Sequence, residues 1–140
     1  MVVIDAQGAV VGRLGARVSK MILAGEQVEI VNAGKAVMLG TLESAKAKFL
    51  SRRSQKNKRN PDESPHYPRV PNMLLRRLIR GMLPWKSQRG RDAYKRLRVT
   101  MDAPKDGKVT KIKEASSDAK HGWFTLSELC RELGYVGKSS

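Results

Sequence analysis

The fold class is decided near the start of the chain, by residues 2–32, which read VVIDAQGAVVGRLGARVSKMILAGEQVEIVN. The apolar runs at residues 2–4 and 28–32 are typical of short buried strands. Between them, one apolar stripe recurs at helical spacing and consists of Leu14, Val18, Met21 and Ile22. It predicts a helix over residues 13–24, which Gly25 ends. A strand, a helix and a second strand in this order predict parallel pairing in an α/β sheet.

The rest of the chain extends this pattern. Further strands are expected at residues 36–39 and 97–101, and helices over residues 41–51, 73–82, 87–96 and 125–133. A capping box that pairs Thr125 with Glu128 opens the last helix. A chain of 140 residues is long enough for one domain of ordinary size. Residues 1–140 are therefore expected to form a single domain, in which residues 104–140 are a polar connection and the C-terminal helix.

Net charge is the strongest compositional signal. The chain has 28 Lys and Arg against 13 Asp and Glu, which gives a formal charge of +15. Seventeen of the cations and three of the acids lie between Lys46 and Arg98, so this middle segment carries +14. A compact domain with such a field repels itself unless a polyanion supplies the counter-charge. Nucleic acid is the commonest such partner, and an anionic membrane surface is the rival.

Residues 52–71 lose all periodicity and are expected to form a basic extended loop. Its cations are interleaved with prolines and are Arg52, Arg53, Lys56, Lys58, Arg59 and Arg69. A loop of about twenty residues without periodicity is usually functional or disordered in a compact domain. Because almost no apolar side chains are available to bury, we expect the loop to become ordered only on RNA. His66 and Tyr67 are expected to stack on RNA or to hydrogen-bond with it.

The helix expected at residues 73–82 has two faces. Its apolar face consists of Leu74, Leu75, Leu78, Ile79 and Met82, and its opposite face of Arg76, Arg77 and Arg80. The first face is typical of a core, whereas the second presents three guanidinium groups. Arginine binds phosphate bidentately and stacks on bases, so this face predicts nucleic-acid binding. No helix-turn-helix, zinc finger or basic zipper is indicated, which favours RNA over DNA.

Three patterns that could indicate an enzyme are weak. The glycines at positions 8, 12 and 15 lack the spacing of a dinucleotide fingerprint, and no acid follows the second strand. Gly137-Lys138-Ser139 resembles the end of a P-loop, but Glu132 stands where the first glycine is required. His66 has no partner acid that would make it a general base. A nucleic-acid-processing enzyme stays the alternative, and the lack of a converging set of catalytic groups favours a binding protein.

No metal, cofactor or small-molecule substrate is indicated. His66 and His121 are the only histidines and Cys130 is the only cysteine, so neither a zinc site nor an internal disulfide is expected. Cys130 falls on an apolar position of the last helix, which is typical of a core residue. No stretch reaches the roughly 18 apolar residues of a membrane span, and the N-terminus lacks the pattern of a signal peptide. We expect a soluble protein of a reducing compartment, without membrane contact.

The region around residues 76–98 resembles a known family. Ile79-Arg80-Gly81-Met82-Leu83-Pro84, followed by Arg89-Gly90, Ala93 and Arg96-Leu97-Arg98-Val99, is similar to the signature of the large-subunit ribosomal protein L13 family. Gly12-Arg13-Leu14, Ile30-Val31-Asn32-Ala33, Lys35 and Gly40 match the same family, and Asn60-Pro61 with Pro65-His66-Tyr67 resembles its loop motif. The resemblance covers about residues 2–101. Trp85-Lys86 and the appended C-terminal helix resemble the archaeal branch.

The sequence departs from the family pattern at three places. Gly34 stands where the family usually has Glu, and Ser64 where the loop motif usually has Gly. Thr100-Met101 replaces a strand end that usually contains Tyr. These departures leave the resemblance intact and bear only on local contacts.

The resemblance implies a three-layer α/β/α fold around a small, mainly parallel sheet of about four strands. It implies a structural constituent of the large ribosomal subunit, not an enzyme, that binds large-subunit rRNA and supports early subunit assembly and translation in the cytoplasm. Neighbouring large-subunit ribosomal proteins are expected partners, and messenger RNA is a further one because some members bind it. The expected RNA-binding residues are Arg13, Arg52, Arg53, Lys56, Lys58, Arg59, His66, Tyr67, Arg69, Arg76, Arg77, Arg80, Lys86, Arg89, Arg91 and Arg96.

Overall fold

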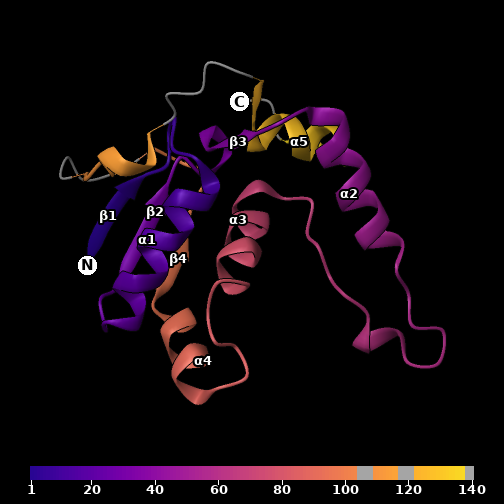
Figure 1. Cartoon of the computed structure of the whole chain (residues 1–140), viewed down its shortest axis with the longest axis horizontal. Helices are drawn as coiled ribbons and strands as arrows, with labels where there is room; N and C mark the ends of the chain where they lie inside the picture. Colours follow the sequence, from indigo (N-terminus) through magenta and orange to yellow (C-terminus); the bar gives the residue numbers. More distant parts are fainter. Residues whose placement is uncertain (104–108, 117–121, 138–140) are drawn as a thin grey trace.

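The computed structural model describes residues 1–103, 109–116 and 122–137 (Figure 1). Its main sheet has three parallel strands in the order β1 (Val2–Asp5), β2 (Val28–Val31) and β4 (Leu97–Val99). A single parallel bridge between Ile4 and Thr110 adds a fourth chain segment beside β1, where the Thr110 amide donates to the Val3 carbonyl at 2.9 Å. The expected α/β class is confirmed.

The strand expected at residues 36–39 lies in a different sheet. It forms β3 (Val37–Leu39), which pairs antiparallel with β5 (Trp123–Thr125). The reason is the short connection from β2, because a parallel neighbour requires a crossover of a dozen or more residues. Left-handed Asn32 (φ 55°) and the 3-10 turn η1 (Ala33–Lys35) redirect the chain instead. Thr110, not β3, therefore takes the fourth place beside the parallel strands.

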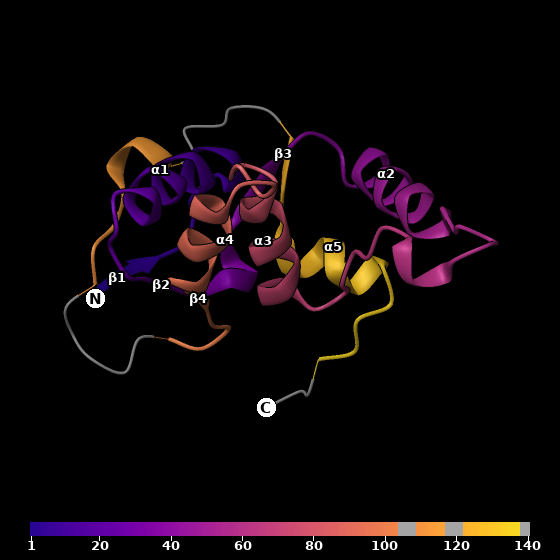
Figure 2. The same cartoon turned by 90° about the horizontal axis from the view of Figure 1, so that it is seen from below.

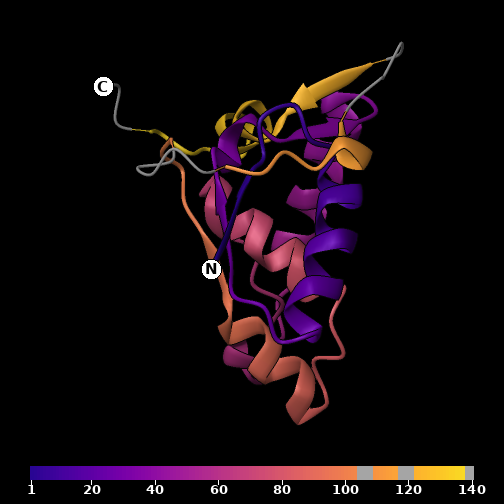
Figure 3. The same ribbon diagram turned by 90° about the vertical axis from the view of Figure 1, so that its left-hand side faces the viewer.

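The helices that contact the main sheet share one of its faces. Both connections, β1 to β2 and β2 to β4, step in the same direction, and right-handed crossovers then place their helices on the same side. α1 (Val11–Leu23), α3 (Pro71–Arg80) and α4 (Gln88–Lys95) lie there, as the views in Figures 2 and 3 agree. Within the described residues the arrangement thus differs from the expected three layers, since no second helical layer is seen.

The core lies between α1, α3 and the sheet. α1 begins two residues earlier than expected, and Gly25 (φ 106°) follows its end as predicted. Leu14, Val18 and Ile22 of its apolar stripe are fully buried. Gly15 faces α3 so closely that an added Cβ would lie 2.7 Å from the Met82 Sδ. A glycine at this position allows the two helices to approach each other.

A second packing unit joins α2 (Leu42–Ser54) to α5 (Leu126–Glu132). The Lys46 Nζ lies 2.6 Å from the Glu132 Oε2 between them. The predicted capping box is confirmed, because the Thr125 Oγ1 accepts from the Glu128 amide and the Glu128 Oε2 accepts from the Thr125 amide. Cys130 is buried, as expected, and burial raises the pKa of its thiol to about 12.

The start of the basic loop differs from the prediction. α2 continues to Ser54, so Arg52 and Arg53 belong to its last turn and not to the loop. No Pro or Gly stands between Leu42 and Asn60, so no backbone-breaking residue ends the helix at the expected position. The loop itself contains only a short 3-10 turn, η2 (Pro61–Glu63).

Some expectations fall outside the described residues. These are His121, most of the Gly137-Lys138-Ser139 motif and parts of the connection, at residues 104–108 and 117–121. Among the helices that the structure describes, none is long and apolar enough to cross a membrane.

Candidate nucleic-acid interface

An open groove separates the end of the loop from α3. We call it the basic groove and define it by residues 63–68 on one side and by Met73, Arg76, Arg77, Arg80 and Tyr94 on the other. It encloses about 700 Å³. Four of the sixteen residues predicted to bind RNA on α3 and in the loop, His66, Arg76, Arg77 and Arg80, line it together with the predicted Tyr67.

α3 presents its arginines to this groove because its other side is buried. Leu74, Leu75 and Ile79 are fully buried, which confirms the predicted division of the helix into two faces. The apolar face is narrower than expected, because Leu78 is half-buried and Met82 is 41% exposed. Pro71 begins the helix at a position where its missing amide hydrogen costs nothing.

Two of these arginines lie over aromatic rings that come from the turn after α3 and from α4. The Arg76 guanidinium carbon is 4.6 Å from the centroid of the Tyr94 ring, and that of Arg80 is 4.6 Å from the Trp85 ring. The two rings meet edge to face at 5.3 Å. The Arg76 Nε is shielded from solvent and has no hydrogen-bond partner in the described residues. Both guanidinium groups are thereby held at defined positions.

Tyr67 makes the corresponding contacts on the other wall of the groove. The Arg77 guanidinium carbon lies 5.0 Å and that of Arg52 lies 5.5 Å from the centroid of its ring. Phe49, the one buried residue of α2, meets the same ring edge to face at 6.0 Å. Tyr67 is thus engaged with two guanidinium groups within the protein, an arrangement that the prediction of a base-stacking Tyr67 did not foresee.

These stacks have a physical consequence for ligand binding. A free arginine side chain loses up to about 2 kcal/mol of rotamer entropy when it becomes ordered. Stacking on a ring is worth about 0.5–1 kcal/mol at an exposed site and leaves the N–H groups at the edge of the guanidinium able to donate. Part of the ordering cost is therefore met before a ligand arrives, and the groove presents several fixed donors for an anion.

The tip of the loop carries three further predicted cations, Lys56, Lys58 and Arg59, all exposed. The Asn57 Oδ1 accepts from the Arg59 amide at 3.1 Å and from the Asn60 amide at 3.3 Å, and so shapes the turn. Ser64 is buried, and its Oγ accepts from the Asn57 amide at 2.8 Å. This hydrogen bond gives a structural role to the serine that replaces the usual glycine.

Arg53 and Arg69 form a separate pair of predicted residues beside α5. The Arg53 Nη1 is shielded from solvent and has no hydrogen-bond partner among the described residues. Burial, and then the charge of Arg69, lower the pKa of the Arg53 guanidinium from its ordinary value. The Arg69 guanidinium lies against Gly134, within 4 Å of the position of an added Cβ. An anion bound here would relieve the repulsion between the two cations.

The turn between α3 and α4 presents Lys86, Arg89 and Arg91, which are all exposed. The glycine of the Arg89-Gly90 motif is required by packing, because an added Cβ at Gly90 would lie 2.1 Å from the Pro84 carbonyl oxygen. The Ser87 Oγ caps α4 by accepting from the Gly90 amide. The signature thus builds a close turn that displays cations on its outside.

Two predicted residues lie outside the groove and make internal hydrogen bonds. The Arg13 Nη1 donates to the Ser116 carbonyl at 3.3 Å, and the Arg96 Nη1 donates to the Ile22 carbonyl at 3.2 Å. Ile22 lies in the last turn of α1, where a cation also complements the helix dipole. The structure therefore does not bring these two arginines together with the others.

The residues that sequence reasoning missed are the aromatic partners Phe49, Trp85 and Tyr94. No local signal identifies them, because they come from three different elements. In retrospect, the concentration of aromatic side chains within the +14 segment was the available indication: five of the seven aromatic residues lie between Lys46 and Arg98. Their role is to position arginines and not to extend the core.

The turn before α1, which raised the possibility of nucleotide binding, is occupied by the chain itself. The Val10 amide donates to the Ala115 carbonyl at 2.7 Å, and the Gly8 amide donates to the Lys35 carbonyl at 3.2 Å. In the described part of the chain, no three His, Cys, Asp or Glu side chains cluster as metal ligands would. The backbone donors that a phosphate would need at this turn are thus used in the fold.

Comparison with known proteins decides which family this groove belongs to. The family model of Ribosomal protein L13 matches residues 1–106, about three quarters of the chain. This chain belongs to the ribosomal protein L13 family. Its role is accordingly structural and not enzymatic, as predicted. The nucleic-acid-processing enzyme that stood as the alternative is excluded by this membership.

Archaeal members of the L13 family are similar over almost their whole length. The large ribosomal subunit protein uL13 of Methanopyrus kandleri is 43% identical over 95% of this chain and 86% of its own. That of Archaeoglobus fulgidus is 42% identical, with 96% and 88% covered, and that of Methanococcus maripaludis is 41% identical, with 96% and 98% covered. The similarity extends beyond residue 106 and therefore includes α5, which confirms the predicted archaeal type of L13.

Proposed function

We propose that this chain is a structural constituent of the large ribosomal subunit that binds large-subunit rRNA through the basic groove and the loop tip. On this proposal it supports early subunit assembly and translation in the cytoplasm. The observation that carries the proposal is the set of guanidinium groups held over aromatic rings along an open groove. The names of the archaeal relatives support the large subunit as its location.

The chemistry of the groove suits an RNA backbone. Phosphate oxygens accept charge-assisted hydrogen bonds from guanidinium groups, and each such bond is worth about 1.5–3 kcal/mol. Glu63 is the one acid that lines the groove, so the field there stays positive. The exposed loop tip adds long-range attraction, and release of counterions from the RNA provides much of the binding free energy. The irregular wall formed by residues 63–68 suits folded RNA with unpaired loops and bulges.

A matched pair of variants tests this proposal. The groove variant combines Arg76→Gln, Arg77→Gln and Arg80→Gln, and the control combines Lys20→Gln, Lys95→Gln and Arg98→Gln. Both lose three charges, and the control residues are exposed and do not line the groove. In filter binding to transcribed large-subunit rRNA, we expect the groove variant to bind at least about tenfold more weakly than the control. Equal losses in both variants would show that only net charge matters and would refute the groove as the binding site.

Neighbouring large-subunit proteins are the second class of partner in this proposal. Membership of the family implies that the chain is associated with rRNA and other ribosomal proteins. The prediction that messenger RNA is a further partner stays a prediction, because no feature of the groove distinguishes it from rRNA.

A further inference from the structure

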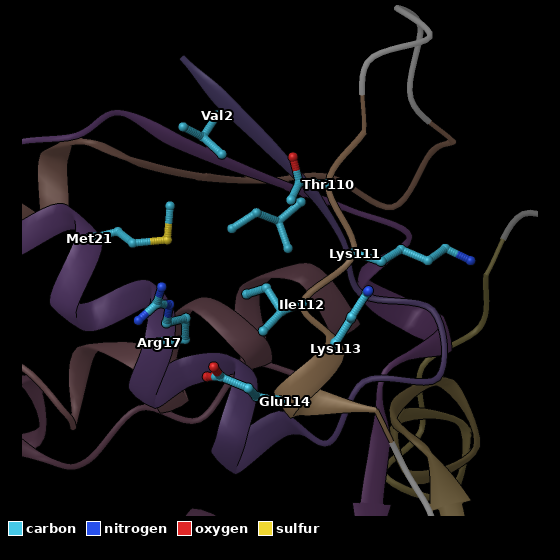
Figure 4. A pocket seen from close by; sticks show the side chains of 9 residues that line it. Val2, Arg17, Met21, Thr110, Lys111, Ile112, Lys113 and Glu114 are labelled. Atoms are coloured by element: carbon cyan, nitrogen blue, oxygen red, sulfur yellow. The ribbon is translucent and has the colours of Figure 1, made fainter.

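A small cavity opens at the opposite side of α1 from the basic groove. Its floor is apolar and is formed by Val2 and Ile4 of β1, Met21 of α1 and Ile112 of the segment beside β1 (Figure 4). Ile4 is fully buried, whereas Val2, Met21 and Ile112 are half-buried. The cavity therefore exposes apolar side-chain surface that neither the core nor the groove uses.

The size of the cavity limits what it can hold. It encloses about 240 Å³, which is below the roughly 300–1,000 Å³ of sites for small molecules and cofactors. A nucleotide or a cofactor is therefore too large, whereas one large apolar side chain is of suitable size. A pocket that receives a single apolar anchor, surrounded by a polar rim, is typical of protein–protein contacts.

The rim of the cavity is mainly positive. It carries Arg17, Lys111 and Lys113 against one acid, Glu114, and all four are exposed. Figure 4 shows Lys111 directed away from the opening, and its Nζ lies 3.7 Å from the Asp5 Oδ2. Arg17 and Lys113 remain at the rim as the cations nearest to an occupant. The parts of the chain outside residues 46–98 carry only +1 in total, so this local excess of cations is not a general property of the region.

The cavity and the basic groove can be occupied at the same time. Gly15 faces α3 and the groove side of the molecule, and Arg17 follows two residues later, about 200° around the helix. Figures 1 and 2 show the loop and α2 at one end of the molecule and β1 and α1 at the other. RNA bound at the groove therefore leaves this cavity open to a different neighbour.

We propose that the cavity between Met21, Ile112 and β1 receives one large apolar side chain of an acidic segment of a neighbouring ribosomal protein. A carboxylate beside this anchor pairs with Arg17 and Lys113. The proposal rests on the association of the chain with the ribosome, but it does not depend on how the basic groove binds RNA.

Photo-crosslinking in assembled large subunits tests the class of partner. A diazirine-bearing lysine analogue replaces Lys113 in one preparation and Lys56, at the loop tip, in the control. We expect the probe at position 113 to crosslink to a protein peptide with Asp or Glu next to a large apolar residue, and the probe at position 56 to crosslink to rRNA. Crosslinks from position 113 to rRNA, to residues 104–108 of this chain or to nothing would overturn the proposal.

A binding measurement without RNA tests the contacts themselves. A synthetic copy of the crosslinked peptide is added to the full chain, and the ¹³C-labelled methyl group of Met21 reports occupancy by NMR. Arg17→Glu should weaken binding about tenfold, whereas the matched charge reversal Lys20→Glu, on the same helix but outside the cavity, should change it less than about threefold. Replacing the apolar anchor of the peptide with Ser should abolish binding. Equal affinities for both protein variants, or for both peptides, would refute the proposal whether or not the groove binds RNA.

Discussion

The cations of the basic segment fall into two groups that differ in how they are held. Those of α3 lie on a helix whose opposite side is buried, and each of them lies over an aromatic ring. Those of the loop tip, Lys56, Lys58 and Arg59, are fully exposed, and within the described residues no aromatic ring lies beneath them. Both groups carry the same charge. The comparison teaches that charge attracts a polyanion, whereas a fixed orientation decides where each phosphate is bound.

The two groups should contribute to binding in different ways. A mobile cation contributes to long-range attraction, which salt screens, and loses side-chain entropy when it binds. A stacked guanidinium has lost part of that entropy before binding and presents its donors in one direction. The predictions below either break this contrast or measure it more finely.

The largest effect is expected on stability, when the support of α3 is removed. Leu75→Ala should lower the free energy of unfolding by about 2–5 kcal/mol, because Leu75 is fully buried under the arginine face. Deletion of residues 56–59 should change it by less than about 0.5 kcal/mol, because these residues are exposed. Urea unfolding followed by circular dichroism measures both. Similar losses in the two variants would mean that the loop tip is part of the scaffold, and the contrast would fail.

The second effect is on the salt dependence of rRNA binding. The deletion of residues 56–59 removes three cations, so the slope of log affinity against log salt should fall by up to about two units. The groove variant should lose affinity at every salt concentration that is tested. Titrations between low and moderate salt give the slopes. An unchanged slope in the deletion variant would mean that the loop tip does not contact phosphate.

A smaller effect is expected when a ring beneath an arginine is replaced. Tyr94→Leu should weaken rRNA binding by about 1 kcal/mol and leave the salt slope unchanged, because no charge is lost. Tyr94→Phe is the control, since it keeps the ring and removes only the hydroxyl group. Isothermal titration calorimetry compares the two. If Phe and Leu weaken binding equally, the ring does not position Arg76 as we infer.

The smallest change concerns dynamics in the free protein. Backbone amides of residues 55–63 should exchange rapidly with solvent, whereas those of α3 should be protected, and rRNA should slow exchange only in the loop. Hydrogen–deuterium exchange read by mass spectrometry measures both segments in one experiment. Strong protection of residues 55–63 without RNA would show that the loop is prefolded, and its expected ordering on RNA would be wrong.

The sequence predicts well those features that depend on neighbouring residues. The two faces of α3 follow from 100° per residue and from the separation of Leu and Ile from Arg. The parallel pairing of β1 with β2 follows from the helix between them. The α5 capping box and the burial of Cys130 follow equally from local pattern.

Features that depend on distant residues were missed. β3 was assigned to the wrong sheet, because its partner β5 lies more than eighty residues away in the sequence. The stacking partners of the arginines arrive from separate elements, so their contacts carry no periodic signal. The replacement of the usual Glu by Gly34 is explained only by α5, because an added Cβ at Gly34 would lie 2.3 Å from the Ser127 Oγ. The appended helix and this glycine therefore belong together.

The position of Thr110 beside β1 has a consequence for the birth of the protein. β1 leaves the translating ribosome first, β2 follows after about twenty-five residues, and the chain that flanks the other edge of β1 is made more than a hundred residues later. Until then, one edge of β1 stays unpaired and can join another strand. Contacts between such distant residues also form slowly. A nascent chain of this protein is thus incomplete at its oldest strand until synthesis is nearly over, and any companion that shields it would have to act on that N-terminal edge.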